Sequence, residues 1–124
     1  MRRHFQIWEY TVSHGQLLLR SNRDADHATR VDILFKDVTY LSLPPSLDLV
    51  GIDELDDGEV RRLLGAPADS ALEYGHTGFG LQLETGRALV VAGSMFTAED
   101  EGAYHEPSSL PVWPMRSGEP TEAV

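Results

Sequence analysis

Four acidic side chains within five residues form the densest group of possible metal ligands in the chain. Its members are Asp53, Glu54, Asp56 and Asp57. Together with Gly58, the first and last of these match positions one, five and six of a calcium-binding EF-hand loop. However, Leu55 fills the third ligand position and Leu64 the twelfth, which needs a bidentate glutamate. The spacing therefore excludes an EF-hand and indicates a solvated acidic surface, with weak, nonspecific cation binding as the alternative.

The five histidines do not form a recognisable metal site. No two of them have the four-residue separation that places a pair of ligands on one face of a helix. His105 stands beside Glu106 and soon after the acidic run 99–101, and is the strongest candidate for a ligand or acid–base group. It lies in an expected loop, where solvated polar residues are also the ordinary finding.

Nucleophilic chemistry has no support in the sequence. The chain has no cysteine, which removes thiol nucleophiles, thiolate metal sites and disulfides together. Ser94 follows Gly93, but Phe96 stands where a nucleophile elbow needs its second glycine. We therefore predict no catalytic residue, cofactor or metal, and favour a protein that is not an enzyme.

Residues 75–80 are rich in glycine but do not match a phosphate-binding loop. The segment lacks a dinucleotide fingerprint and a Walker lysine, and no strand-to-helix transition surrounds it. The glycines are predicted to serve a tight turn or a bulge, with a binding loop as the alternative.

The chain is strongly acidic, with a formal charge of −10 and an isoelectric point near 4.7. Such a charge disfavours binding to nucleic acid, because that affinity comes mainly from basic groups that displace counterions. It suits a basic protein partner, although acidic surfaces also promote solubility on their own.

Trp113 stands between two prolines in an irregular segment. It either holds the end of the chain against its own surface or anchors a partner, since tryptophan is enriched in binding hot spots. With the four acidic residues it completes the predicted partner-binding set: Asp53, Glu54, Asp56, Asp57 and Trp113.

The length of 124 residues fits one domain with a sizeable core. We expect that domain to span residues 1–115, with a disordered tail at 116–124 that follows a run of prolines. No apolar signal-peptide core follows the basic start, and no apolar stretch reaches the roughly 18 residues of a membrane span. The expected location is the cytoplasm.

Apolar segments with strand-like alternation carry the expected core. Residues 5–12 and 16–20 are predicted to form strands around a turn at 13–15, and the leucines at 17–19 indicate either cover on both faces or a place near a strand end. Residues 31–43 alternate with a change of phase near Lys36 and Asp37, which predicts a bulge or bend. Residues 47–52 are predicted as a short edge strand.

One helix and one hairpin complete the expected elements. Asp57 is the predicted helix N-cap, and Gly65 the stop. Residues 79–92 predict a hairpin whose second strand, the unbroken apolar run 88–92, is central and covered on both faces. After Phe96 we expect no regular structure.

The predicted fold class is α+β, with an antiparallel sheet of five to seven strands, strongly bent or partly closed, and one short helix. The favoured function is a non-enzymatic acidic protein-interaction domain of the antagonist or adaptor type. The alternative is a small-molecule-binding protein or enzyme with a pocket in the bent sheet. A third possibility is self-association through an edge strand such as 47–52.

Overall fold

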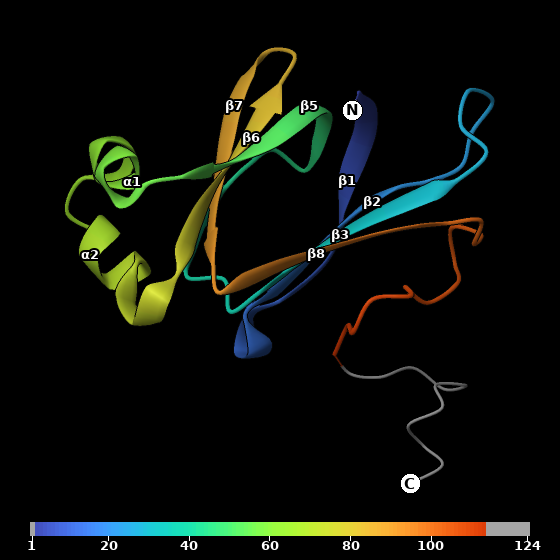
Figure 1. The fold of residues 1–124 in the computed structure, drawn as a ribbon. Coiled ribbons are helices and arrows are strands. Elements are labelled where there is room, and N and C mark those ends of the chain that lie inside the picture. Colours follow the sequence, from blue (N-terminus) through green and yellow to red (C-terminus); the bar gives the residue numbers. More distant parts are fainter. Residues whose placement is uncertain (1, 114–124) are drawn as a thin grey trace, which may run out of the picture.

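Eight strands form one antiparallel sheet in the computed structural model, which describes residues 2–113 (Figure 1). The strands are β1 (Arg3–Thr11), β2 (Gln16–Ser21), β3 (Arg30–Lys36), β4 (Tyr40–Ser42), β5 (Ser46–Leu55), β6 (Thr77–Leu83), β7 (Gly86–Ala92) and β8 (Ser94–Asp100). Their order across the sheet is β4-β7-β6-β5-β1-β2-β3-β8. The helices α1 (Asp57–Leu64) and α2 (Ala68–Ala71) connect β5 to β6, and short 3-10 turns occupy Val12–His14 and Glu73–Gly75.

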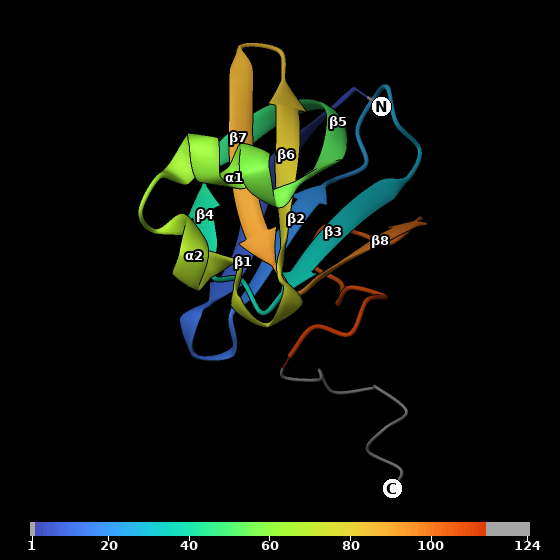
Figure 2. The same ribbon diagram turned by 60° about the vertical axis from the view of Figure 1, so that its left-hand side comes forward.

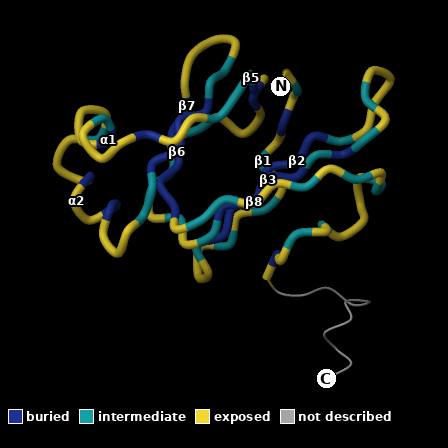
Figure 3. Tube along the Cα trace, viewed as in Figure 1, coloured by how far each residue is buried: buried dark blue, intermediate teal, exposed yellow. Residues whose placement is uncertain are grey.

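The sheet folds over on itself. Phe35 of β3 and Phe79 of β6 meet edge to face with ring centroids 5.5 Å apart, although four strand spacings, about 19 Å in a flat sheet, separate their strands. The inner faces of the two halves therefore pack together and form the main core (Figure 3). The described sheet is bent but not closed, because β4 and β8 each have a strand neighbour on one side only.

The chain crosses between the two halves at one corner. There Asp37 adopts a left-handed conformation, with φ of 57°, which aspartate tolerates better than most residues. The N–H of Gly93, between β7 and β8, donates to the carbonyl of Lys36 at 2.9 Å. The bend predicted near Lys36 and Asp37 is thus confirmed, and it sends the chain from β3 into the short strand β4.

Two strand predictions are wrong. Residues 47–52 belong to β5, which pairs with β1 up to Leu49 and with β6 from Leu49 onward, so they are part of a central strand rather than a separate short edge strand. The chain also continues as β8 beyond Phe96, because the acidic residues there lie on an outermost strand where polar side chains stay accessible or find partners. The sheet consequently has eight strands rather than five to seven.

The helix begins one residue earlier than predicted. Asp56, not Asp57, is the N-cap, and its carboxylate accepts from the N–H of Glu59 at 2.8 Å. The extended backbone of Asp56 aims its side chain at the first free N–H groups, whereas Asp57 is already helical. Gly65 ends the helix as predicted.

The helices cover the outer face of β6 and β7 (Figure 2). This second layer explains the unbroken apolar run of β7: Val90 faces the main core, whereas Leu89 and Val91 face the helices. The hairpin and its doubly covered strand are confirmed. Likewise Leu17 and Leu19 face the main core, and Leu18 is covered on the opposite face.

Gly78 on β6 lets α1 approach the sheet. A Cβ atom at this position would lie 2.4 Å from Cγ2 of the fully buried Val60. This glycine therefore serves close packing near the start of β6 rather than the predicted tight turn or bulge, whereas Gly75, with φ of 78°, fits the predicted turn.

We predict that Gly78→Ala lowers the free energy of unfolding by about 1–3 kcal/mol, because α1 must move away from an overpacked contact. Gly51→Ala is the matched control, since a Cβ atom there meets nothing within 4 Å. Urea unfolding of both variants tests this. Equal stability of the two variants would contradict the packing role of Gly78.

Candidate functional site

The four acidic residues predicted to bind a partner lie together where β5 leads into α1. Asp53 and Glu54 end the strand, Asp56 caps the helix and Asp57 begins it. All four are exposed. We call this group the acidic turn.

Half of the acidic turn has a structural task within the fold. Asp56 caps α1, and Asp53 accepts a hydrogen bond from the amide of Gln82 at 2.6 Å. The side chains of Glu54 and Asp57 make no hydrogen bond or ion pair with other residues in the 2–113 range. Two carboxylates thus stay free on ordered backbone.

Trp113 does not join the acidic turn: it lies at the end of the described segment that follows β8 and contacts His14 and Gln16 instead. Its ring stacks on His14 with centroids 3.4 Å apart. The backbone N–H of Trp113 donates to the side-chain oxygen of Gln16 at 2.7 Å, and the side-chain amide of Gln16 donates to the backbone carbonyl of Trp113. The ring holds the chain against its own surface and remains 43% exposed.

Residues 101–113 form a strap over the outer face of β2 and β3. Leu110 and Val112 of the strap pack on Leu18 and Leu34, and so supply the second cover that the leucine run predicted. The domain predicted from the sequence extends to residue 115; its last two residues, like the predicted tail 116–124, lie outside the described range.

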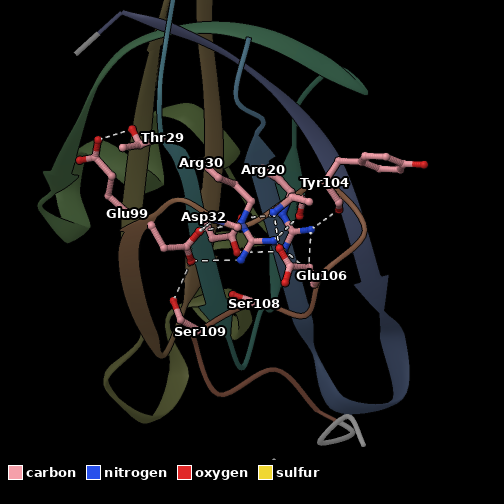
Figure 4. A network of polar contacts seen from close by, with 12 residues as sticks. Arg20, Thr29, Arg30, Asp32, Glu99, Tyr104, Glu106, Ser108 and Ser109 are labelled. Atoms are coloured by element: carbon pink, nitrogen blue, oxygen red, sulfur yellow. Dashed lines mark hydrogen bonds and ion pairs between the residues drawn. The ribbon is translucent and has the colours of Figure 1, made fainter. Parts of the chain in front are cut away.

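Two buried arginines hold the strap (Figure 4). Arg20 donates to both carboxylate oxygens of Asp32, at 2.7 and 3.0 Å, and to the carbonyl of Tyr104 at 2.7 Å. Arg30 pairs in the same way with Asp100. It also donates to three strap carbonyls, those of Ala103, Glu106 and Pro107. Each guanidinium thus joins an ion pair within the sheet to the backbone of the strap.

Neither arginine stands out in the sequence. What would reveal them is the strand register, which places Arg20 directly across from Asp32 and Arg30 directly across from Asp100. Opposite charges at facing positions of an antiparallel pair stabilise the sheet. Pairing therefore had to be known before this signal became visible.

A cavity of about 310 Å³ lies between the strap and β1. A β-bulge between Ile7 and Glu9 places both Trp8 and Glu9 on the outer face, where they line this cavity. The guanidinium carbon of Arg20 lies 5.1 Å from the centroid of the Trp8 ring, a cation–π contact.

The candidate cluster of His105 and Glu106 also lines this cavity. The carboxylate of Glu106 accepts from the backbone N–H of Ala103 at 2.5 Å, and His105 lies edge-on to Tyr104. Within residues 2–113, no three histidine or carboxylate side chains are grouped so as to hold a metal ion. The cluster thus has a local structural task in the strap.

A second hollow, a groove of about 410 Å³, opens at the unclosed side of the sheet. It is lined by Arg3, Val31, Ile33, Ile52, Thr97, Ala98 and Glu99. Arg3 donates to the hydroxyl of Ser21 at 3.1 Å and the carbonyl of Thr29 at 2.7 Å. Glu99 accepts from the hydroxyl of Thr29 at 2.5 Å. The groove thus has apolar walls and two charged groups: the guanidinium of Arg3, which is hydrogen-bonded within the fold, and the carboxylate of Glu99.

Comparison of the chain with protein-family models, curated proteins and solved structures found no match. Within the described residues, no helix is long and apolar enough to cross a membrane. Function must therefore be argued from the surfaces of the chain itself.

We predict that Arg20→Met destabilises the fold by about 3–5 kcal/mol, because it leaves Asp32, 1% exposed, as a buried charge without its partner. The double variant Arg20→Met, Asp32→Leu removes both charges and regains more than half of that loss. Urea unfolding measures both. If the double variant is as unstable as the single one, the buried charge is not the cause.

Asp100 accepts hydrogen bonds from Arg30, which holds the strap, so protonation of Asp100 should make the attachment of the strap depend on pH. Burial raises the pKa of this carboxyl, but hydrogen bonds from Arg30, the N–H of Gly102 and Ser109, with the charge of Arg30, outweigh burial and leave the pKa below its ordinary value of 3.8. A lowered pKa in the folded state stabilises the fold above 3.8, and that contribution disappears as the pH falls through the folded pKa.

We therefore expect the difference in unfolding free energy between the natural chain and Asp100→Asn to be largest above pH 3.8 and to shrink at lower pH. Urea unfolding at stepped pH, down to the lowest value at which both proteins stay folded, measures the difference. A gap that stays constant across this range would show that Asp100 is not the titrating group.

Proposed function

We propose that this protein is a non-enzymatic interaction domain of the antagonist or adaptor type that binds a basic protein partner through the acidic turn. One observation carries the proposal. Glu54 and Asp57 are exposed and make no ion pair with the described residues, whereas the five arginine–carboxylate and two histidine–carboxylate pairs in that range use other carboxylates.

Electrostatics support a basic partner. The chain carries a formal charge of −10, so its field attracts cationic proteins and repels the phosphate backbone of nucleic acids. Complementary charge speeds association and selects partners, and salt weakens such attraction. The acidic turn supplies this charge from fixed backbone, which lowers the entropy lost on binding.

Glu54 separates the functional explanation from a structural one. Asp56 caps α1, and Asp57 lies in its first turn, where the helix dipole favours a negative charge. Glu54 lies on β5, before the helix, opposite Phe79 of β6, and has no such task. Its charge therefore gives the fold no evident benefit and is available to a partner.

The groove at the open side of the sheet favours a second candidate, a small-molecule-binding protein. Its volume of about 410 Å³ lies in the range of ligand pockets, roughly 300–1,000 Å³. Val31, Ile33 and Ile52 would contact an apolar ligand, and Glu99 at the rim would favour a cationic group.

The test begins with the folded protein immobilised and exposed to lysate of its source organism at low and moderate salt. A retained basic protein is identified by mass spectrometry, and its Kd is then measured. We expect Glu54→Gln with Asp57→Asn to weaken binding on the order of tenfold, and added salt to weaken it further.

The control changes the same amount of charge elsewhere. Asp26 and Glu73 are also exposed, so Asp26→Asn with Glu73→Gln should alter the Kd by less than about twofold. Equal effects of both double variants, or binding insensitive to salt, would refute the acidic turn as the contact. Failure of the folded protein to retain any protein would favour the small-molecule candidate.

A further inference from the structure

The outer edge of β8 is long and unprotected. β8 pairs with β3 along seven residues, and no backbone hydrogen bond from the described residues reaches its other side. In an antiparallel strand every second residue turns its N–H and C=O away from its neighbour. β8 therefore presents a row of free donors and acceptors.

The opposite edge of the sheet, formed by β4, is short and lies against the helices. β4 has only three residues. It lies beside the helical layer, where Thr39, just before the strand, donates to the carbonyl of Ala71 in α2. Natural edges are commonly short or covered, or carry lysine, proline or a bulge. The middle of β8, Met95 to Ala98, has no charged residue and no proline, and its pairing with β3 is continuous.

The groove runs along the inner face of the same edge. Thr97 and Glu99 stand opposite Ile33 and Val31, which belong to the main core or pack against it. Both residues line the groove, with Ile52 of β5 as another wall. Because side chains alternate between the faces of a strand, a strand added beside β8 would direct every second side chain toward this groove.

The charges around the groove favour a basic strand. Glu99 lies on its wall and Glu101 is exposed directly after β8. Glu54 projects from the same face of β5 as Ile52, since the two stand opposite the core residues Phe79 and Leu81. The guanidinium of Arg3 is already engaged by Ser21 and Thr29. Carboxylates thus dominate what an added strand would meet.

We propose that the edge of β8 accepts an extended segment of a partner protein, which alternates apolar and basic residues and adds a ninth strand to the sheet. Its basic side chains would face the groove, with their apolar stems against Ile33 and Ile52 and their charges toward Glu99. Its apolar side chains would face the outer side of β8, beside Phe96. Strand addition of this kind gains affinity from main-chain hydrogen bonds and specificity from pockets for alternate side chains. This inference rests on the proposed function in one respect only, namely that the partner is basic. A second copy is a poorer occupant, because each copy carries −10.

The probe is a synthetic peptide of about nine residues that alternates valine and lysine, a common strand length. It is titrated onto the full chain while amide hydrogen exchange is followed by NMR. We expect the outward-facing amides of β8 to exchange roughly tenfold or more slowly when the peptide is bound, with β4 unchanged.

Thr97→Lys tests the same contact by substitution. The new lysine puts a positive charge in the groove and on the strand edge, where it repels a basic peptide, so binding of the peptide should weaken at least about tenfold. Ser42→Lys is the matched control, an exposed residue of β4, and should leave binding unchanged. Thermal unfolding checks that both variants fold, and the exchange measurement on the natural chain needs no variant.

Three results would overturn the proposal. The first is no slowing at β8 with the peptide near millimolar concentration, the weak end of specific affinities. The second is equal slowing with a peptide that alternates valine and glutamate. The third is a dimer that protects β8 without peptide, which would identify a second copy as the occupant. Protection of β8 combined with partner binding that ignores the acidic-turn variants would refute only the acidic turn.

Discussion

The need to bury one face of a single sheet governs this structure. An eight-stranded sheet with apolar residues on its inner face has no second sheet to cover it, so it bends until its two halves pack together. The contact of Phe35 with Phe79 marks where the halves meet. Burial of such aromatic and aliphatic side chains contributes about 1.5–3 kcal/mol each, which makes this core the main source of stability.

The bend also determines how the outer faces of the sheet are covered. The outer faces of the two halves point away from each other and need separate covers. The helices cover the face of β6 and β7, and the strap covers that of β2 and β3. The helical cover is apolar and relies on close approach at Gly78, whereas the strap is held by Arg20 and Arg30 donating to its carbonyl groups. Proline has no backbone N–H, so a segment that contains several prolines cannot form a full ladder of backbone hydrogen bonds to a strand. The side chains of Arg20 and Arg30 supply hydrogen bonds to the strap instead.

The same bend leaves an open side. Because β4 and β8 do not meet, one edge of the sheet and one groove remain accessible next to each other. The acidic turn follows from β5, a central strand that passes through this region before it enters α1. The two surfaces that we connect with binding thus arise from one topological fact, a sheet that is bent without being closed.

The sequence by itself determined which segments are apolar and how they alternate. The phase change near Lys36 and Asp37, the hairpin at 79–92 and the leucine run at 17–19 each follow from local periodicity, and each is confirmed. The helix was located to within one residue, because capping and stop signals act over a few neighbouring positions.

Only the tertiary structure decided which strand lies at an edge and what the charged residues contact. Residues 47–52 proved central and β8 proved outermost, because strand order depends on contacts between distant segments. Local alternation does not show that Arg20 and Asp32 are buried, because it is the strap that covers them and makes their pairing obligatory. The acidic turn is visible in the sequence as a cluster of carboxylates. That Glu54 and Asp57 have no partner among residues 2–113 depends on which other carboxylates pair in the fold.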